Sequence, residues 1–267
     1  MGVVNVTPDS FSDGGLYLSS SSAVEQALRL VDDGADLLDI GGESTRPYAD
    51  VVDAEEELHR VLSVVERLAR ETDVPISIDT SKAIVAQAAL DAGAEVINDV
   101  TGLEGDPAML ATALASGAGV CAMHMQGTPQ TMQDDPHYAD VVSEIHEYLR
   151  QRRDALAAAG IPLEQICLDP GVGFGKTHQH NLTLMAQGGK FHDLGCPLLI
   201  GHSRKGFLAK VIGDKEADRD AATAGAALAL AAQGIQILRV HNVRLVREAL
   251  LAFEACGGTD GDELILG

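Results

Sequence analysis

Short runs of β-branched and aliphatic residues, bounded by glycine, proline or polar residues, recur eight times along the chain and are typical of buried strands. The segments between them carry apolar residues at helical spacing, as Ala23, Val24, Ala27, Leu28 and Val31 do. The predicted strands cover residues 3–7, 37–41, 76–80, 96–100, 119–125, 166–170, 198–203 and 236–241. The predicted helices lie around residues 23–31, 53–71, 82–92, 106–116, 138–159, 180–194, 217–233 and 243–256.

The alternation of strands and helices predicts parallel pairing, because a parallel neighbour requires a crossover of about a dozen residues or more. Eight such units in roughly 250 residues favour an α/β fold of the (β/α)8 TIM-barrel type, and a doubly wound open sheet is the main alternative. No Pro-, Gly- or Ser-rich linker divides the chain. We therefore expect a single domain over residues 1–267, with an acidic tail at about 258–267 that frays.

The charge of the chain narrows the classes of partner. Its 267 residues include 19 Lys and Arg against 40 Asp and Glu, a formal charge of −21. A field of this sign repels polyanions at long range, which excludes nucleic acid and anionic membranes as partners. Four widely spaced cysteines predict neither a zinc site nor a disulfide scaffold, and no signal peptide or membrane span stands out, so we expect a cytoplasmic protein.

Every predicted strand ends in polar side chains, and in a barrel these ends share the face on which chemistry takes place. One strand-end Asp or Asn is often only a helix cap or a turn residue. When eight polar strand ends converge in one barrel mouth, their side chains must form hydrogen bonds with a ligand or with one another, because burial of polar groups without partners costs free energy. The residues are Asn5, Thr7, Asp39, Asp79, Asn98, Asp99, His124, Asp169, Ser203, Arg204, Lys205, Arg239 and His241.

These polar ends differ in kind around the barrel. Asp79, Asn98 and Asp169 offer acceptors and an amide to a flat, donor-rich molecule. The last two strands supply Lys205, Arg239 and His241, in a region where such barrels often bind phosphate. No residue pair of the nucleophile-and-base type is identifiable from the sequence, so covalent catalysis is not expected.

Asn5 interrupts a strand of valines, and its amide must be satisfied by a neighbour or by a hard metal ion. One neutral oxygen does not hold Mg²⁺ unless phosphates supply further ligands. The metal prediction therefore depends on the phosphate prediction. Two loops are expected to border the barrel mouth. Residues 169–176 contain three alternating glycines, but their spacing is neither that of a dinucleotide-binding motif nor that of a P-loop. Residues 7–15 form a polar loop of the kind that can close over a site as a lid.

Eight motifs follow the predicted strands in order. They are NVTPDSFSDGG at 5–15, GGESTRP at 41–47, SIDT at 77–80, IND at 97–99, MHMQG at 123–127, LDPG at 168–171, SRK at 203–205 and RVH at 239–241. Together they resemble the signature set of the dihydropteroate synthase family over nearly the whole chain. The first two motifs are long enough to be highly specific.

The resemblance implies a transferase of folate biosynthesis. Such an enzyme condenses 6-hydroxymethyl-7,8-dihydropterin diphosphate with 4-aminobenzoate and releases diphosphate. It also implies Mg²⁺ as cofactor, dissociative loss of diphosphate before attack by the arylamine, competition by sulfonamides, and a homodimer with small-molecule substrates as its only other partners.

By matching position, the resemblance also implies roles for individual residues. The expected pterin ligands are Asp79, Asn98, Asp169 and Lys205. The expected diphosphate ligands are Thr45, Arg46, Arg239 and His241, and Asn5 would share their Mg²⁺. The aminobenzoate would be framed by Thr7, Pro8, Phe11, Ser12, Pro47 and Gly206. Catalysis would rest on Asp79, Lys205, Arg239 and His241.

Two departures from the family pattern accompany the resemblance. Only Met1 and Gly2 precede the first strand, where family members usually carry a short extension, so the floor of the barrel is expected to be less covered. Gly206 stands where some members have Ser, so an aminobenzoate carboxylate there would meet a backbone N–H but no hydroxyl.

Two other functions stay open at this point. The first is a pterin-binding methyltransferase domain, which has no diphosphate to bind, and the Thr45-Arg46 and RVH motifs weigh against it. The second is a catalytically silent paralogue, against which the complete motif set weighs.

Overall fold

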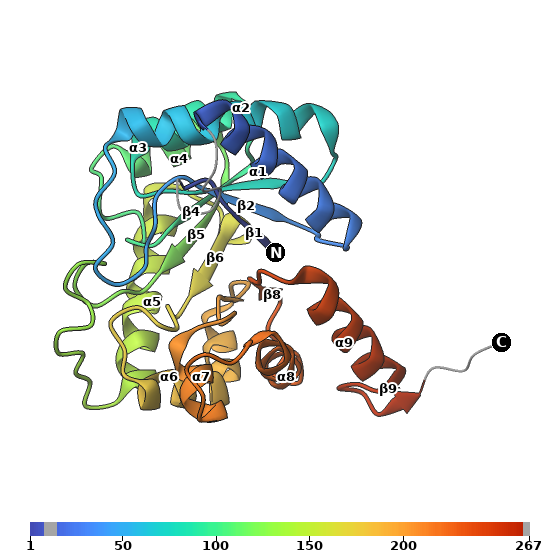
Figure 1. Cartoon of the computed structure of the whole chain (residues 1–267). Coiled ribbons are helices and arrows are strands. Elements are labelled where there is room, and N and C mark those ends of the chain that lie inside the picture. The colour runs from blue at the N-terminus through green and yellow to red at the C-terminus, as the bar shows by residue number, and fades with distance from the viewer. Residues whose placement is uncertain (8–14, 264–267) are drawn as a thin grey trace.

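Eight short parallel strands form the inner layer of the structure, a computed structural model that describes residues 1–7 and 15–263 (Figure 1). The first six pair in chain order in one sheet, and the last two pair with each other. The strands are β1 Gly2–Asn5, β2 Leu38–Gly41, β3 Ile76–Asp79, β4 Val96–Asp99, β5 Gly119–Met123, β6 Ile166–Asp169, β7 Leu199–Ile200 and β8 Ile237–Leu238.

Parallel bridges join the two sheets at both of their edges. Between β6 and β7, the Leu168 N–H donates to the carbonyl oxygen of Pro197 at 2.9 Å. Between β8 and β1, the Val3 N–H donates to the carbonyl of Val240 at 3.1 Å, and the Val240 N–H donates to that of Met1 at 2.9 Å. The eight strands therefore follow one another around a ring, which confirms the predicted barrel and excludes the open sheet.

Helices connect successive strands and cover the outside of the ring (Figure 1). Local sequence sets their ends: the Asp53 side chain accepts from the Glu56 N–H at 2.8 Å at the start of α2, and Gly160, with φ of 112°, ends α5. The helices are α1 Gly15–Asp32, α2 Ala54–Glu71, α3 Ala83–Asp91, α4 Met109–Ser116, α5 Val141–Ala159, α6 His178–Ala186, α7 Gly206–Ile212, α8 Asp220–Ala231 and α9 Val243–Ala255.

Three elements differ from the prediction. The helix expected over 180–194 is split into α6 and a 3₁₀ helix, η3 Gly188–Leu194, because two adjacent glycines follow Gln187. α7 was not predicted, since its seven residues are too few to show helical periodicity. The expected frayed tail instead begins with a hairpin, in which β9 Cys256–Gly257 pairs with β10 Asp262–Glu263.

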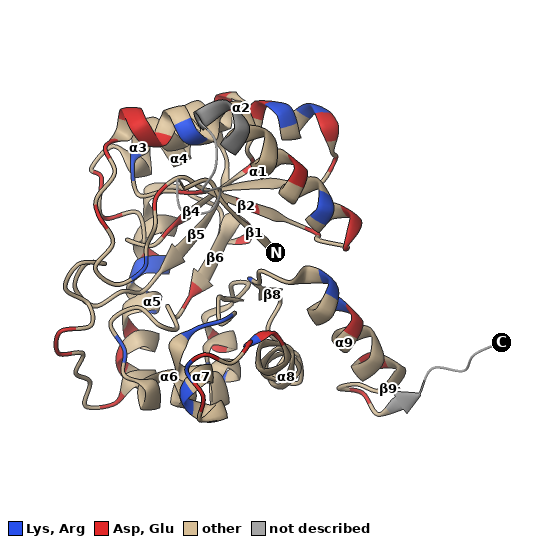
Figure 2. Cartoon of the chain, in the orientation of Figure 1, with Lys and Arg blue, Asp and Glu red and all other residues tan. Residues whose placement is uncertain are grey.

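The core lies between the ring of strands and the helices. Outward-facing residues such as Ile40 and Ile78 are fully buried, as are Val61, Val65 and Leu68 on the inner stripe of α2. Acidic residues occur along α2, α5 and α9 (Figure 2), and on α2 Glu55, Glu66 and Glu71 are exposed. None of the described helices is long and apolar enough to cross a membrane.

Candidate active site

A buried ion-pair cluster occupies the centre of the barrel mouth. Arg239, just after β8, donates from Nε to Asp39 Oδ2 at 2.6 Å and from Nη2 to Asp79 Oδ2 at 2.7 Å. The Asn98 amide also donates to Asp39 Oδ2, at 3.1 Å. Burial disfavours the guanidinium cation, but the two carboxylates outweigh it and raise the pKa of Arg239. Strands β2, β3, β4 and β8 thus contribute to one polar network.

Asp79 is the titratable member of this cluster. The pKa of its carboxyl is raised to about 7: burial is the largest cause, Arg239 opposes the shift, and the nearby charges of Asp39, Glu57 and Asp99 add to it. Near neutral pH this carboxyl therefore exchanges a proton, so it can accept hydrogen bonds as a carboxylate or carry a proton itself.

A second pair of charged groups comes from β6 and the end of β7. Asp169 accepts the Gly171 N–H at 2.7 Å, and burial raises the pKa of this carboxyl. The Lys205 ammonium donates to the Val172 carbonyl and lies 4.4 Å from the centre of the Phe174 ring. Burial, partly offset by Asp169, lowers the pKa of Lys205 to about 8. Both groups face the same mouth as the Arg239 cluster, and Asp169 and Arg239 interact electrostatically.

The glycine-rich loop after β6 packs tightly on the loop after β5. Gly171 has φ of 68°, and a Cβ there would lie 1.9 Å from the carbonyl oxygen of His124. Lys176 is 2 % exposed; its Nζ lies 3.0 Å from His124 Nδ1 and donates to the Phe174 carbonyl at 2.8 Å. Burial lowers the pKa of Lys176 well below its usual range. Burial and the charge of Lys176 together lower the pKa of His124 to about 3.

Positive groups gather around His241. Burial first, and then the charges of Arg204, Arg239 and Arg46, lower the pKa of His241 to about 4. Arg204 adopts a left-handed φ of 57° and binds Asp220 with Nε at 2.6 Å and Nη2 at 2.8 Å. A neutral imidazole surrounded by guanidinium groups is suited to bind an anion.

Ser203 and His241 form a pair that the sequence did not reveal. Ser203 Oγ lies 2.9 Å from His241 Nδ1 and also accepts the His241 backbone N–H at 3.3 Å. If the hydroxyl proton points to Nδ1, the other ring nitrogen, Nε2, carries the N–H and can donate to an anion. An imidazole with a pKa of about 4 is a weak base, so this pair orients His241 and does not activate Ser203.

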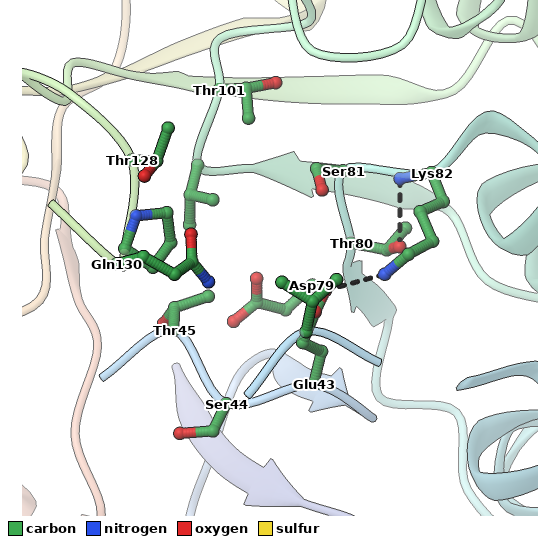
Figure 3. A pocket seen from close by; sticks show the side chains of 13 residues that line it. Glu43, Ser44, Thr45, Asp79, Thr80, Ser81, Lys82, Thr101, Thr128 and Gln130 are labelled. Atoms are coloured by element: carbon green, nitrogen blue, oxygen red, sulfur yellow. Dashed lines mark hydrogen bonds and ion pairs between the residues drawn. The ribbon is translucent and has the colours of Figure 1, made fainter. Parts of the chain in front are cut away.

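The loop after β2 borders a cavity of about 230 Å³. Thr45 and Asp79 both line it, together with residues that follow β3, β4 and β5 (Figure 3). Arg46 and Pro47, which follow Thr45, are exposed. The cavity therefore connects the predicted diphosphate loop with the carboxylate cluster at the centre of the mouth.

The remaining predicted residues lie at the rim. Asn5 ends β1 opposite Gly41, is half-buried, and its side chain makes no hydrogen bond to any residue that the structure describes. Thr7 follows β1 and is half-buried, and Gly206 begins α7 and is exposed. Within residues 1–7 and 15–263, no three His, Cys, Asp or Glu side chains form a group that could hold a metal. Pro8, Phe11 and Ser12 lie outside the described residues.

Two residues at the mouth were given no role from the sequence. Asp39 is fully buried between Leu38 and Ile40, and this alternation was a signal that it points into the barrel. Arg204 lies within the SRK motif, but nothing in the sequence indicated that its charge would act on His241.

Comparisons with known proteins identify the family of the chain. The family described as pterin binding enzyme matches residues 1–241. Dihydropteroate synthase of Escherichia coli K12 is 44% identical over 255 residues, 96% of this chain and 90% of that protein.

Solved structures agree as well. Yersinia pestis dihydropteroate synthase with a sulfonamide drug complex has a TM-score of 0.90 at 44% identity, covering 96% of this chain and 92% of that one. The Xanthomonas albilineans enzyme in complex with 7,8-dihydropteroate has a TM-score of 0.86 at 43% identity, with the same coverage of 96% and 92%. The chain belongs to the dihydropteroate synthase family of pterin-binding enzymes, which are transferases.

Proposed function

We propose that the chain condenses 6-hydroxymethyl-7,8-dihydropterin diphosphate with 4-aminobenzoate and releases diphosphate. The observation that carries this proposal is that one mouth holds a buried acceptor cluster beside a neutral His241 that is surrounded by the positive charges of Arg204, Arg239 and Arg46. The first suits a donor-rich heterocycle, and the second suits its diphosphate. The bound product of the Xanthomonas albilineans relative, 7,8-dihydropteroate, supports the same reaction.

In this proposal the pterin lies over the centre of the mouth. Asp79 and Asp169 accept from the amino-pyrimidinone edge, as ionised carboxylates can for two parallel N–H donors. Asn98 is held by Asp39, which orients its amide, and Lys205 donates on the carbonyl side. All four are fixed by strand ends or by short contacts, so little order has to be gained when the ring binds.

The diphosphate is proposed to bind between the loop after β2 and the end of β8. Thr45 and Arg46 approach from the first, and Arg239 and His241 from the second. Arg204 adds positive charge behind His241. Arg239 donates to the two carboxylates with two of the five N–H groups of its guanidinium, so it can meet the diphosphate with another N–H and with its charge while it keeps both partners.

The residues present fit a magnesium ion that is shared with the substrate. Asn5 offers one uncommitted amide oxygen at a strand end, and no multi-carboxylate group competes for the ion within the described parts of the chain. When bound, Mg²⁺ would neutralise charge on the leaving diphosphate. Asn5 would orient it, and the remaining ligands would come from diphosphate oxygens and water.

The chemistry that these side chains support is loss of diphosphate before attack by the amine. Asp79 and Asp169 stabilise positive charge that develops on the pterin and its methylene, and His241 with its guanidinium neighbours stabilises negative charge on the leaving group. The aromatic amine of 4-aminobenzoate is neutral at physiological pH, so no side chain has to deprotonate it before attack. Thr7, Pro8, Phe11, Ser12, Pro47 and Gly206 are proposed to frame this second substrate.

The decisive experiment mixes the purified protein with both substrates, with and without Mg²⁺. We expect dihydropteroate and diphosphate in equal amounts, only when Mg²⁺ is present, and inhibition by a sulfonamide that competes with 4-aminobenzoate. Methyl transfer from a tetrahydrofolate without diphosphate release would instead favour the methyltransferase function. Pterin binding without turnover would favour a silent paralogue. We further propose a homodimer, as the resemblance implies, which sedimentation velocity tests.

A further inference from the structure

A half-buried cation lies on the wall of the cavity that Thr45 and Asp79 line. Lys82 follows β3 at the start of α3. Its ammonium lies 2.6 Å from Glu43 Oε2 (Figure 3), and it also lies 2.6 Å from Glu57 Oε2. Glu43 belongs to the loop after β2, and Glu57 to the first turn of α2. One ammonium therefore links three separate segments of the chain.

Through Glu43, this ammonium closes the loop that carries Thr45 and Arg46. Glu43 Oε1 accepts the Val52 N–H at 2.9 Å, so the side chain bridges the two ends of residues 43–52. The base of the loop is also held from α2, because Arg60 donates to the Gly42 carbonyl at 2.8 Å. Without a cation on its second oxygen, the half-buried Glu43 would face the buried carboxylate of Glu57.

Through Glu57, the same ammonium neutralises a charge close to Asp79. Glu57 is fully buried, and its Oε1 has no hydrogen-bond partner in the described part of the chain. Its charge acts on Asp79 from α2, together with the charges of Arg239 from the end of β8, Asp39 from β2, Asp99 from β4 and Lys205 from the end of β7. Lys82 thus balances the charge of an acidic group that reaches Asp79 from the helix layer.

We infer that Lys82 is a positioning residue, which holds the loop of residues 43–52 in its binding conformation through Glu43 and keeps Glu57 neutralised behind Asp79. The inference rests on the proposed function, since it concerns the binding of the diphosphate substrate and the protonation of a pterin ligand. Lys82 lines the same cavity as Thr45 and Asp79, and the role inferred for it is exerted through its two partners.

The two effects are separable by substitution. Glu43→Gln keeps an oxygen for the Val52 N–H but weakens the link to Lys82, so we expect the KM for the pterin diphosphate to rise about tenfold with kcat little changed. Glu57→Gln removes a negative charge near Asp79 and fills the unpartnered position with a neutral amide. We expect it to fold normally and to move the acid limb of the pH profile to lower pH by roughly one unit.

Lys82→Met should combine the loop effect with the opposite pH effect. It leaves two carboxylates without their cation, so the KM rises and the acid limb moves to higher pH. Lys82→Arg, which keeps the charge, should restore most of both properties. Arg67→Met is the matched control, because Arg67 forms a surface ion pair with Glu71 on the same helix at 3.2 Å and should change neither property.

Steady-state assays of dihydropteroate formation across about pH 5.5–9 measure all five variants, and thermal unfolding reports their folding. If Lys82→Met does not fold, the Glu43→Gln and Glu57→Gln results decide. Unchanged KM in Glu43→Gln together with an unchanged acid limb in Glu57→Gln overturns the inference. A wild-type protein that forms no dihydropteroate overturns the proposed function instead, so the two failures are distinct.

Discussion

Arg239 Nε lies 2.6 Å from Asp39 Oδ2, across 200 residues of sequence, and this contact joins the last strand of the ring to the second. Asp39 is fully buried, and its other contacts come from the Asn98 amide. The pair therefore connects the proposed pterin ligands with the proposed diphosphate ligands.

Asp39→Asn should be costly although Asp39 is not proposed to touch substrate. The variant leaves the buried guanidinium of Arg239 with Asp79 alone, and removal of one partner from a buried pair costs about 3 kcal/mol or more. We expect a clear fall in the free energy of unfolding, measured by urea denaturation, and weaker pterin binding. A variant with wild-type stability would show that Arg239 finds another partner easily.

Asp79→Asn should affect turnover far more than stability. It removes a charge directed at the ring, and loss of one such electrostatic contact lowers kcat by about 100-fold or more. In the wild type, kcat/KM should fall as the pH drops below about 7, because the carboxyl is then protonated. The variant should lose this acid limb, and normal turnover in it would contradict the assignment.

The same raised pKa predicts how stability changes with pH. The folded chain keeps the Asp79 proton up to about pH 7, whereas the unfolded chain releases it near the ordinary aspartate pKa of 3.8. This group's contribution to stability is therefore present below that value and is lost as the pH rises toward 7. The stability difference between Asp79→Asn and wild type should move in favour of the variant over this window, as urea titrations at several pH values would measure.

His241→Ala should lower the affinity for diphosphate without lowering the affinity for the pterin. The side chain lies among guanidinium groups at the end of β8, so its loss should weaken diphosphate binding about tenfold, as expected for a hydrogen bond to a charged group. Affinity for a pterin without phosphates should stay nearly unchanged. Calorimetry with inorganic diphosphate and with the pterin measures both, and equal losses would mean that the proposed division is wrong.

Two glycines with the same backbone conformation give a matched test of the loop after β6. Gly171 and Gly117 both have φ of 68°, but a Cβ on Gly117 meets nothing within 4 Å, whereas one on Gly171 lies 1.9 Å from a carbonyl oxygen. Gly117→Ala should cost about 1–2 kcal/mol of backbone strain. Gly171→Ala should cost considerably more and abolish turnover, because the loop that carries the Asp169 contact must move. Comparable unfolding energies for the two would contradict this account of the loop.

Much of the fold followed from periodicity, because strands that are buried on their outer face and helices with one apolar stripe leave a clear pattern. The strand-end rule also brought Asp79, Asn98 and Arg239 to one mouth. What the sequence did not contain was the partner of each group. Arg239 pairs with Asp39, and Ser203 pairs with His241. Both pairings depend on which strands become neighbours when the barrel closes and on the lengths of the side chains.

Short elements were also beyond prediction. α7 and the two-residue pairing of β7 with β8 are set by tertiary contacts, because neither is long enough for local preference to decide. In the sequence, Lys82 is an ordinary residue at the start of a helix. Its contact with Glu57 depends on how α2 packs, which the sequence does not show.

The acidic outer helices have a kinetic consequence for binding of the diphosphate substrate that we propose. Far from the mouth, that substrate meets the field of the whole chain and is repelled, and only within roughly a Debye length, about 10 Å at 0.1 M salt, does the local cluster at His241 dominate. Added salt screens the distant repulsion more than the short-range attraction. The encounter rate should therefore rise with moderate ionic strength, the reverse of an enzyme that steers its substrate from afar.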